Sequence, residues 1–454
     1  EKEAFAYFAA AIFGMFAFAL GAFRIRRDLF HEELVWKSAI GLGVIFGCAF
    51  VAAGASALIA RLLRKLMARP GFEPLARAAT GFALLALLGV GLAATLALGS
   101  RGAPTSAHEA GSDRGGSAGN VLFIVIDTLR ADHLPAYGYE NGQTPHLDRF
   151  ADDAIRFDQA FTNSSWTRPS FASILTGRLP SSHGVMAKSD ALPDAVTTLP
   201  EALKGKGYAT GGYATNFNVA PYFNFHQGFD DYVFLEPEFV LGADDASAKL
   251  LLMQFVRQRI EKLRAARGDV LPGTAYQDAA TVNAAVTSWI DAQASAPWFL
   301  FVGYMDPHDP YFAHPYDGSG YARAAHQHPD ASEAPALTKL YDGEISYWDA
   351  EFGKLLEQLE ERGLYDELTI VVTSDHGEEF NEHGGFWHGT TLYDEQVRVP
   401  LFVKLPESRR GGTVVRHWVQ SIDLMPTVLK LSGAEVPQGV QGGDLFVGTD
   451  VVYA

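Results

Sequence analysis

Two short apolar runs, each followed by acidic side chains, constrain this chain most strongly. Residues 121–126 are all apolar and mostly β-branched, and Asp127 follows them directly. Residues 368–373 form a similar run, with Asp375 and His376 just beyond it. Short runs of this kind predict buried parallel strands, and open α/β sheets build ligand sites at the carboxyl ends of their strands. The sequence therefore predicts that these three side chains meet around one metal ion.

Alternating strand and helix patterns predict the fold class. Further strand-like runs occupy residues 298–304 and 400–405. Helical patterns cover residues 199–206, 244–266, 277–292, 337–362 and 421–432. Strands that alternate with helices predict an α/β sandwich around a mostly parallel central sheet.

The first hundred residues do not have the composition of a soluble domain. Residues 4–23, 38–60 and 78–99 are uncharged and mostly apolar, and each stretch has about the twenty residues needed to cross a bilayer core of about 30 Å. A cleaved signal peptide would account for only one of them. We therefore expect residues 1–99 to form a membrane domain with three transmembrane helices. Buried helices of a soluble domain are the weaker alternative.

The charges between these stretches favour one orientation. The loop after the second stretch carries Arg61, Arg64, Lys65, Arg69 and Arg77 against Glu73 alone. The positive-inside rule places such a loop in the cytoplasm. An odd number of spans then places the rest of the chain on the periplasmic or extracellular side of a cell inner membrane. Because the chain starts at Glu1 rather than at a methionine, we also expect further spans before it.

The rest of the chain predicts a flexible linker and one acidic domain. Residues 100–119 are rich in Gly, Ser and Ala, which is typical of a tether. The domain of residues 120–454 is expected to continue beyond its last residues. Residues 102–454 contain 25 basic and 47 acidic side chains, and this net charge of −22 argues against nucleic acid as a partner. The only cysteine, Cys48, lies in the second apolar stretch, so the acidic domain has no disulfide.

The segment of residues 164–177 suggests an anion site. Pro169 suits the first turn of a helix, which places Thr167 at or just before the N-cap. The hydroxyl of Thr167 would then lie in the positive field of a helix terminus, where anions bind. Plain structural readings remain open for each element. Thr167 and Asp127 could be capping residues, and Asp375-His376 could be a turn with a solvated imidazole.

Taken together, these segments resemble the sulfatase family of the alkaline phosphatase superfamily, over about residues 120–443. The resemblance is carried by Asp127-Thr128-Leu129-Arg130-Ala131-Asp132, Tyr137-Gly138-Tyr139, Thr144-Pro145-His146-Leu147-Asp148, residues 167–177, Pro180-Ser181-Ser182-His183-Gly184, Asp306-Pro307-His308, Asp375-His376-Gly377, Val399-Pro400-Leu401 and Asp423-Leu424-Met425-Pro426-Thr427. It implies an alkaline-phosphatase-like sandwich and an enzyme that acts on ester bonds.

The chain departs from the family pattern at the nucleophile. Sulfatases carry Cys-x-Pro-Ser-Arg, whose cysteine is oxidised to formylglycine; here Thr167 stands at the cysteine and Phe171 at the arginine. Because threonine cannot give that aldehyde, no formylglycine is expected. Threonine nucleophiles occur in similar enzymes, the phosphoethanolamine and phosphoglycerol transferases of bacterial envelopes. Those enzymes also have several membrane spans before an outer domain.

The resemblance implies a divalent metal ion. Its ligands would be Asp127, Thr167, Asp375 and His376. Thr128 replaces a second aspartate of many sulfatases, and His376 replaces an asparagine. Losing a carboxylate and gaining an imidazole favours Zn²⁺ or Mn²⁺ over Ca²⁺.

The same resemblance assigns further site residues. His308 and His388 would act with Thr167 in catalysis, and Lys404 and Asn216 would bind the substrate. A surface-loop histidine is the alternative for His308, and a strand-end lysine for Lys404. For His383, a place in a solvated loop is as consistent with the sequence as a place in the active site. His183 is expected to have a structural role.

The implied reaction is attack of Thr167 on a phosphate-type ester, with a covalent phospho-threonine intermediate. The expected substrate is a small or lipid-linked phospho-ester, and the expected partner is the lipid bilayer. Three alternatives remain: a sulfuric ester or phosphonate ester hydrolase, a catalytically inactive binding module with the same fold, and a metal-independent structural membrane protein.

Overall fold

The structure is a computed structural model, and it describes residues 6–7, 10–15, 17–18, 39–67, 119–237, 273, 275–293, 297–318, 320–323 and 326–454. The chain divides into two compact units. The first comprises Glu1–His108 with Phe239–Glu261, and the second comprises Glu109–Glu238 with Lys262–Ala454.

The first unit contains one long apolar helix within its described part. Helix α2 (Ala39–Met67) includes Gly43–Lys65, a 23-residue stretch with a mean hydropathy of 2.1, long and apolar enough to cross a membrane. A single helix of this kind is also compatible with a signal sequence or a core helix. It coincides with the second predicted span. The first span is described only in part and the third, residues 78–99, lies outside the described residues, so three spans remain a prediction.

The second unit is built on an eight-stranded sheet with the order β12-β2-β11-β8-β1-β5-β3-β4. Its strands are β1 (Val121–Ile126), β2 (Ile155–Phe161), β3 (Ala209–Ala214), β4 (Asp231–Phe234), β5 (Trp298–Tyr304), β8 (Thr369–Ser374), β11 (Leu401–Lys404) and β12 (Val414–Gln420). Seven strands run parallel, and β11 runs antiparallel to both of its neighbours. The predicted mostly parallel sheet is therefore confirmed.

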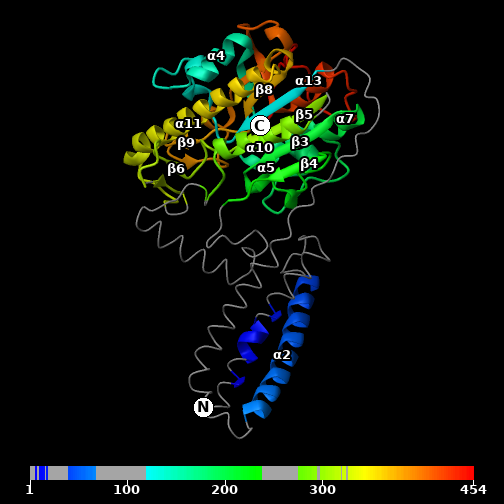
Figure 1. The fold of residues 1–454 in the computed structure, drawn as a ribbon. Coiled ribbons are helices and arrows are strands. Elements are labelled where there is room, and N and C mark those ends of the chain that lie inside the picture. The colour runs from blue at the N-terminus through cyan, green and yellow to red at the C-terminus, as the bar shows by residue number, and fades with distance from the viewer. Residues whose placement is uncertain are drawn as a thin grey trace. The chain divides into compact units, whose positions relative to one another are not determined.

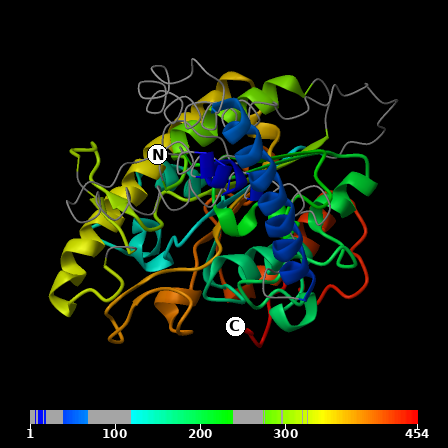
Figure 2. The same ribbon diagram turned by 90° about the horizontal axis from the view of Figure 1, so that it is seen from below.

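Helices cover both faces of the sheet (Figure 1). Alternate residues of β1 belong to different hydrophobic clusters. On one face, Ile124 belongs to a cluster with residues of α4 (Pro145–Asp153), α10 (Ala279–Ala292) and α11 (Ala334–Glu361). On the other face, Phe123 belongs to a cluster with residues of α5 (Thr167–Thr176), α7 (Leu199–Gly205) and α13 (Leu424–Leu431). Figure 2 shows the yellow α11 and the red C-terminal segment on opposite sides of the sheet. The strand buries side chains on both faces, which explains its wholly apolar sequence.

Short elements complete the unit beside the sheet. They are α6 (Pro180–His183), α12 (Asp394–Val397), the pair β6 (Tyr311–Phe312) with β7 (Gly320–Tyr321), and the pair β9 (Glu379–Phe380) with β10 (Phe386–Trp387).

The strand predictions agree best with the structure where the sequence is most apolar. Four strands of the sheet were not predicted, and for β3 the reason is physical. Strands β1 and β5 match their predicted bounds, whereas β2, β3, β4 and β12 were not predicted. Strand β3 contains Gly211 and Gly212, because a Cβ there would collide with the rings of Trp289 and Tyr232. Its glycines are required by packing, yet they weaken the strand signal. The predicted helix over residues 244–266 lies outside the described residues.

The turn after β8 depends on a glycine. The N–H of Gly377 donates to the carbonyl oxygen of Gln396 at 2.9 Å, and a Cβ at Gly377 would collide with the backbone carbonyl of Glu395. The segment containing Glu395 therefore packs directly on the residue that follows His376. This close approach fixes the end of β8 against the segment before β11.

Gly377→Ala should lower the free energy of unfolding by about 1–3 kcal/mol, the usual cost of overpacking a close contact. Urea denaturation of the purified protein measures this. Gly205→Ala in α7 is the matched control, because a Cβ there meets no atom within 4 Å and alanine is the better helix former. Equal stability of the two variants would contradict the packing role of Gly377.

Candidate active site and metal centre

Side chains from two distant stretches of the sequence meet where strands β1 and β8 end: Asp127 from one stretch, and Asp375 and His376 from the other. Strands β1 and β8 pair in parallel with Ile126 opposite Ser374, so the next residues, Asp127 and Asp375, are neighbours. The Nε2 atom of His376 lies 3.6 Å from Oδ1 of Asp127 and 3.3 Å from Oδ2 of Asp375. The ligand atoms of these three residues all lie within 4.8 Å of one another. The structure therefore brings the three side chains together, and the metal ion among them remains a prediction.

The electrostatics of this cluster favour a cation. All three residues are buried, and Oδ1 of Asp127 and Oδ2 of Asp375 have no hydrogen-bond partner. Burial, together with the charge of Asp127, raises the pKa of Asp375 well above its usual range. Burying two carboxylates with unpaired oxygens is costly unless a cation neutralises them. The donor set therefore fits a divalent metal ion.

His376 is held in the form that binds metals. Its Nδ1 atom lies 2.9 Å from the carbonyl oxygen of Gly377, so Nδ1–H donates and the lone pair of Nε2 faces the carboxylates. Burial and the neighbouring His388 lower the pKa of His376 to about 3. The imidazole is therefore neutral at physiological pH, as coordination requires.

Thr167 completes the cluster from the other side. It is the first residue of α5, with Trp166 rather than Thr167 as the N-cap. Its Oγ1 lies 3.2 Å from Nε2 of His376. The hydroxyl of Ser170 donates to the carbonyl oxygen of Asp375 at 2.5 Å, which ties the first turn of α5 to the end of β8. The hydroxyl predicted as fourth ligand thus lies beside the imidazole of His376.

Asn216 contacts the cluster through Asp127. Its Nδ2 donates to Oδ2 of Asp127, and its Oδ1 accepts from the N–H of Asn218 at 2.7 Å. The amide therefore directs the other carboxylate oxygen, Oδ1, toward His376. Its predicted contact with substrate remains a prediction.

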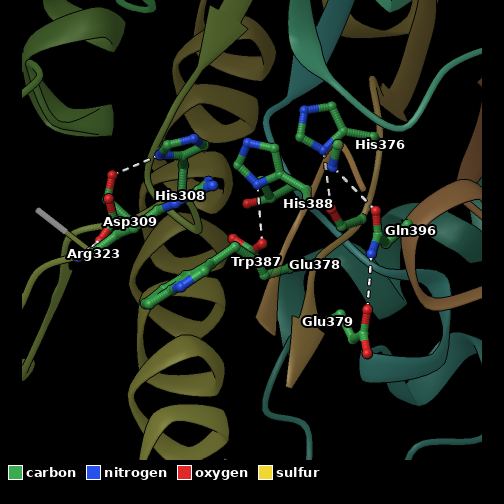
Figure 3. Close-up of polar contacts among 12 residues, drawn as sticks. His308, Asp309, Arg323, His376, Glu378, Glu379, Trp387, His388 and Gln396 are labelled. Carbon is green, nitrogen blue, oxygen red and sulfur yellow. Dashed lines mark hydrogen bonds and ion pairs between the residues drawn. The ribbon is translucent and has the colours of Figure 1, made fainter. Parts of the chain in front are cut away.

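Two further imidazoles extend the site in a row with His376 (Figure 3). The ring centroids of His308 and His388 are 5.1 Å apart, and those of His388 and His376 are 4.5 Å apart. The Nδ1 of His308 donates to the carbonyl oxygen of Asp309 at 2.6 Å, and Nδ1 of His388 lies 2.9 Å from Oε1 of Glu378. In both rings Nε2 remains available for a substrate.

The surroundings of these two rings push their pKa values in opposite directions. Burial alone would lower the pKa of His308, but the charges of Asp127, Asp309 and Glu378 outweigh it and raise that pKa. Burial and the neighbouring His308 lower the pKa of His388 well below its usual value. Opposite shifts in adjacent groups are typical of acid and base partners.

Sequence reasoning assigned no role to Glu378, although it lies two residues after His376. Its carboxylate is buried, and its Oε2 accepts a hydrogen bond from the hydroxyl of Tyr311 at 2.9 Å while Oε1 orients His388. The available signal was the charge itself, since a carboxylate next to a buried strand needs a partner. Arg323, whose guanidinium lies 5.7 Å from the Trp387 ring centroid, was also missed.

The structure does not bring Lys404 to this site. Strand β11 pairs antiparallel with β8, with Lys404 opposite Ile370 and Leu401 opposite Thr373. Lys404 therefore lies near the end of the strands that is opposite to Asp375. Its Nζ donates to the carbonyl oxygen of Tyr365 at 2.7 Å. The prediction of anion binding by Lys404 is therefore wrong, because the carboxyl end of the one antiparallel strand points away from the site.

Two other histidines considered in the sequence analysis, His183 and His383, contact other groups than His308, His388 and His376. The Nε2 of His183 is 3.1 Å from Oγ of Ser173, and its Nδ1 accepts from the N–H of Val185 at 3.1 Å, so both ring nitrogens contact neighbouring protein groups. The Nδ1 of His383 pairs with Oε1 of Glu395 at 2.6 Å.

Comparisons with known proteins identify one family. A family model described as Sulfatase matches residues 119–434. The chain is 28% identical over 345 residues to the ulvan-active sulfatase of Formosa agariphila, covering 72% of this chain and 64% of that protein, which is less than two thirds of its length. It is 27% identical over 396 residues to the multifunctional alkaline phosphatase superfamily protein PehA of Trinickia caryophylli, covering 72% of this chain and 76% of that protein.

Solved structures with a similar fold include two phosphonate monoester hydrolases. The enzyme SpPMH from Silicibacter pomeroyi aligns with a TM-score of 0.55 and 22% identity, covering 72% of this chain and 76% of that one. The enzyme of Agrobacterium radiobacter aligns with a TM-score of 0.57 and 21% identity, covering 74% and 79%. At this identity the likeness establishes the fold alone.

Asp375→Asn should reduce the number of tightly bound divalent ions by at least one per chain. The substitution keeps the shape of the side chain but removes half of the carboxylate charge that attracts the ion. Metal analysis after gel filtration measures the content. Asp291→Asn is the control, because its carboxylate pairs with Arg362 at 2.7 Å on the surface. Unchanged metal content in Asp375→Asn would argue against this centre.

Proposed function

The chain belongs to the sulfatase family, and from that premise we propose that it is a membrane-anchored, metal-dependent hydrolase or transferase of phosphate-type esters. The observation that carries this proposal is the position of Thr167. Its hydroxyl stands at the start of α5, where sulfatases resembling this chain have their nucleophile, and lies 3.2 Å from His376.

The ion would be held by Asp127, Asp375, His376 and the Thr167 hydroxyl. The fit rests on the two buried, unpartnered carboxylate oxygens and on the free Nε2 of His376. A donor set of three oxygens and one nitrogen suits Zn²⁺ or Mn²⁺. When bound, such an ion would lower the pKa of the Thr167 hydroxyl and withdraw charge from the ester oxygens.

In the first step, Oγ1 of Thr167 attacks phosphorus. A Thr167–phosphorus ester bond forms, the bond from phosphorus to the leaving oxygen breaks, and the hydroxyl proton of Thr167 passes to a base. The first turn of α5 stabilises the charge on the non-bridging oxygens, because its backbone N–H groups and the helix dipole point toward them.

His308 and His388 supply the proton transfers. Both direct Nε2 away from the groups that hold Nδ1. His308 lies among carboxylates that favour its charged form, so it donates a proton to the leaving oxygen. His388 is held neutral by burial and accepts a proton.

The second step frees Thr167. Water or an acceptor hydroxyl attacks phosphorus and gives its proton to His308, which the first step left neutral. The Thr167–phosphorus bond breaks, and the oxygen of Thr167 regains its proton from His388. With water as acceptor the protein is a hydrolase, and with a sugar or lipid hydroxyl it is a transferase.

A sulfuric or phosphonate ester is the second candidate substrate. It is supported by the names of the relatives, which include sulfatases, and by the fold shared with phosphonate monoester hydrolases. Thr167 itself favours phosphorus, because threonine cannot form the aldehyde that the resembling sulfatases use. Retention of Asp127, Asp375 and His376 argues against an inactive binding module.

The membrane part of the proposal rests on the apolar sequence. Helix α2 has the length and composition of a span, and the basic side chains in its last turns and just after it favour a cytoplasmic end. The catalytic unit would then face the periplasm or the cell exterior, where lipid-linked phospho-esters are accessible.

Thr167→Ala should reduce turnover of an aryl phosphodiester on the order of 10⁴-fold or more, because it removes the nucleophile. Thr167→Ser keeps a hydroxyl at the same place and should retain measurable turnover. Initial rates on aryl phosphodiesters, phosphate monoesters, phosphonates and sulfates distinguish the candidate reactions. Mass spectrometry of the wild-type peptide that contains Thr167 should show the covalent group after rapid quenching. Full activity of Thr167→Ala would rule out the proposed mechanism.

Glu378→Gln should lower kcat about 10–100-fold with little change in KM, as expected when a group that orients a functional histidine is altered. Because Glu378 helps raise the pKa of His308, its loss lowers that pKa. The rate falls as protonated His308 is lost, so the alkaline limb of the pH profile should move to lower pH. Glu382→Gln, whose carboxylate pairs with Arg130 instead, should leave that limb in place.

A further inference from the structure

A second cluster of potential metal ligands lies outside the site described above. Glu379, His383 and Glu395, here called the loop cluster, place one ligand atom each within 4.8 Å of one another. Glu379 belongs to β9, His383 to the turn that follows it, and Glu395 to α12. None of the three takes part in the proposed reaction.

The loop cluster is held in place by neutral groups and by an aromatic ring. The Nδ1 of His383 lies 2.6 Å from Oε1 of Glu395, and its ring stacks on Tyr393 with centroids 3.6 Å apart and planes 6° from parallel. Oε1 of Glu379 accepts from the N–H of Gly385 at 2.8 Å, and Oε2 accepts from Nε2 of Gln396 at 3.0 Å. The side chains therefore keep their positions without a metal ion.

The charge of the loop cluster is unbalanced. Glu379 is 1% exposed and Glu395 is 6% exposed, so both carboxylates are buried. The hydrogen-bond partners of Glu379 are two backbone N–H groups and an amide, all of them neutral. The nearby Arg130 is bound to Asp132 and Glu382 instead. Two buried carboxylates against a single imidazole leave negative charge that a bound cation would neutralise.

We propose that Glu379, His383 and Glu395 bind a second divalent transition-metal ion, separate from the centre at Asp127. One imidazole and two carboxylates are ligands that Zn²⁺ and Mn²⁺ accept. The side chain of His383 is 43% exposed, which leaves a water ligand room on the outer side. Atoms bound to one tetrahedral Zn²⁺ lie about 3.3 Å apart, so His383 and Glu395 need to separate only slightly.

The position of the loop cluster gives this ion a structural task. Glu379 and Glu395 lie on either side of the segment that carries Trp387 and His388 into the active site. Gln396 links the two regions, because its Nε2 donates to Glu379 while its Oε1 accepts from the N–H of Gly389 at 3.1 Å. The bond between Gln396 and Glu379 is drawn in Figure 3. An ion in the loop cluster would clamp both ends of this segment and so position His388.

Zinc content per chain, measured by mass spectrometry after equilibration with a weak chelator, tests the proposal. Wild type should hold two ions. His383→Gln and Asp375→Asn should each hold one, and the double variant none. His328→Gln, which changes an exposed histidine elsewhere, should hold two. If His383→Gln holds as much zinc as wild type, the proposal that the loop cluster binds an ion is refuted. If only Asp375→Asn loses zinc, the centre at Asp127 is the one that binds it.

Two further measurements cover the case in which His383→Gln folds poorly. Zinc should raise the melting temperature of Asp375→Asn, since the loop cluster is intact there, but not that of Asp375→Asn combined with Glu395→Gln. Anomalous scattering at the zinc edge from wild-type crystals should show a peak among Glu379, His383 and Glu395. Absence of both the thermal shift and the peak would refute this second site without affecting the first.

Discussion

The parallel pairing of β1 with β8 is the constraint on which the site depends. Because Ile126 lies opposite Ser374, the pairing places Asp127 and Asp375 side by side in the interior. Two buried carboxylates repel each other, and the register leaves them no means of moving apart. The other groups at this edge relieve the repulsion: Asn216 donates to one carboxylate, and two backbone N–H groups donate to the other. The remaining oxygens are where a divalent cation fits.

The hydrophobic core extends this constraint to the loops. Tyr341 of α11 is buried in the cluster beneath the sheet, and its hydroxyl donates to the carbonyl oxygen of Thr128 at 2.6 Å while accepting from the N–H of Arg130 at 2.9 Å. Thr128 has a φ of +58°, a conformation that costs a non-glycine residue of order 1 kcal/mol or more. The long helix thus holds the turn that aims Asp127. On the other face, Ser170 plays the corresponding part for Asp375.

The sequence predicted the parts of the site that depend on local pattern. The apolar run before Asp127, the largely apolar run before Asp375 and the proline in the first turn of α5 can all be recognised in the sequence alone. The features that depend on how the strands pair could not be predicted from the sequence. The direction of β11 is set by its pairing and not by its composition, and for that reason Lys404 was misplaced. Arg323 meets the Trp387 ring only when separate loops fold together, so no spacing in the sequence reveals it, whereas the charge of Glu378 beside a buried strand was a signal that the sequence did offer.

The charge of the proposed centre also bears on its substrate. Two carboxylates, a neutral imidazole and a hydroxyl carry a charge of about −2, which one divalent cation would neutralise. A second carboxylate in place of Thr128 would leave such a centre negative. With the centre neutral, the start of α5 and His308 supply the positive field felt by the ester. A field of this size matches an ester with one negative charge better than an ester with two. If the proposed function holds, phosphodiesters, phosphonate monoesters and sulfate esters, which carry one negative charge, therefore suit the site better than phosphate monoesters, which carry about two. The resulting order of preference follows from charge, whichever acceptor completes the reaction.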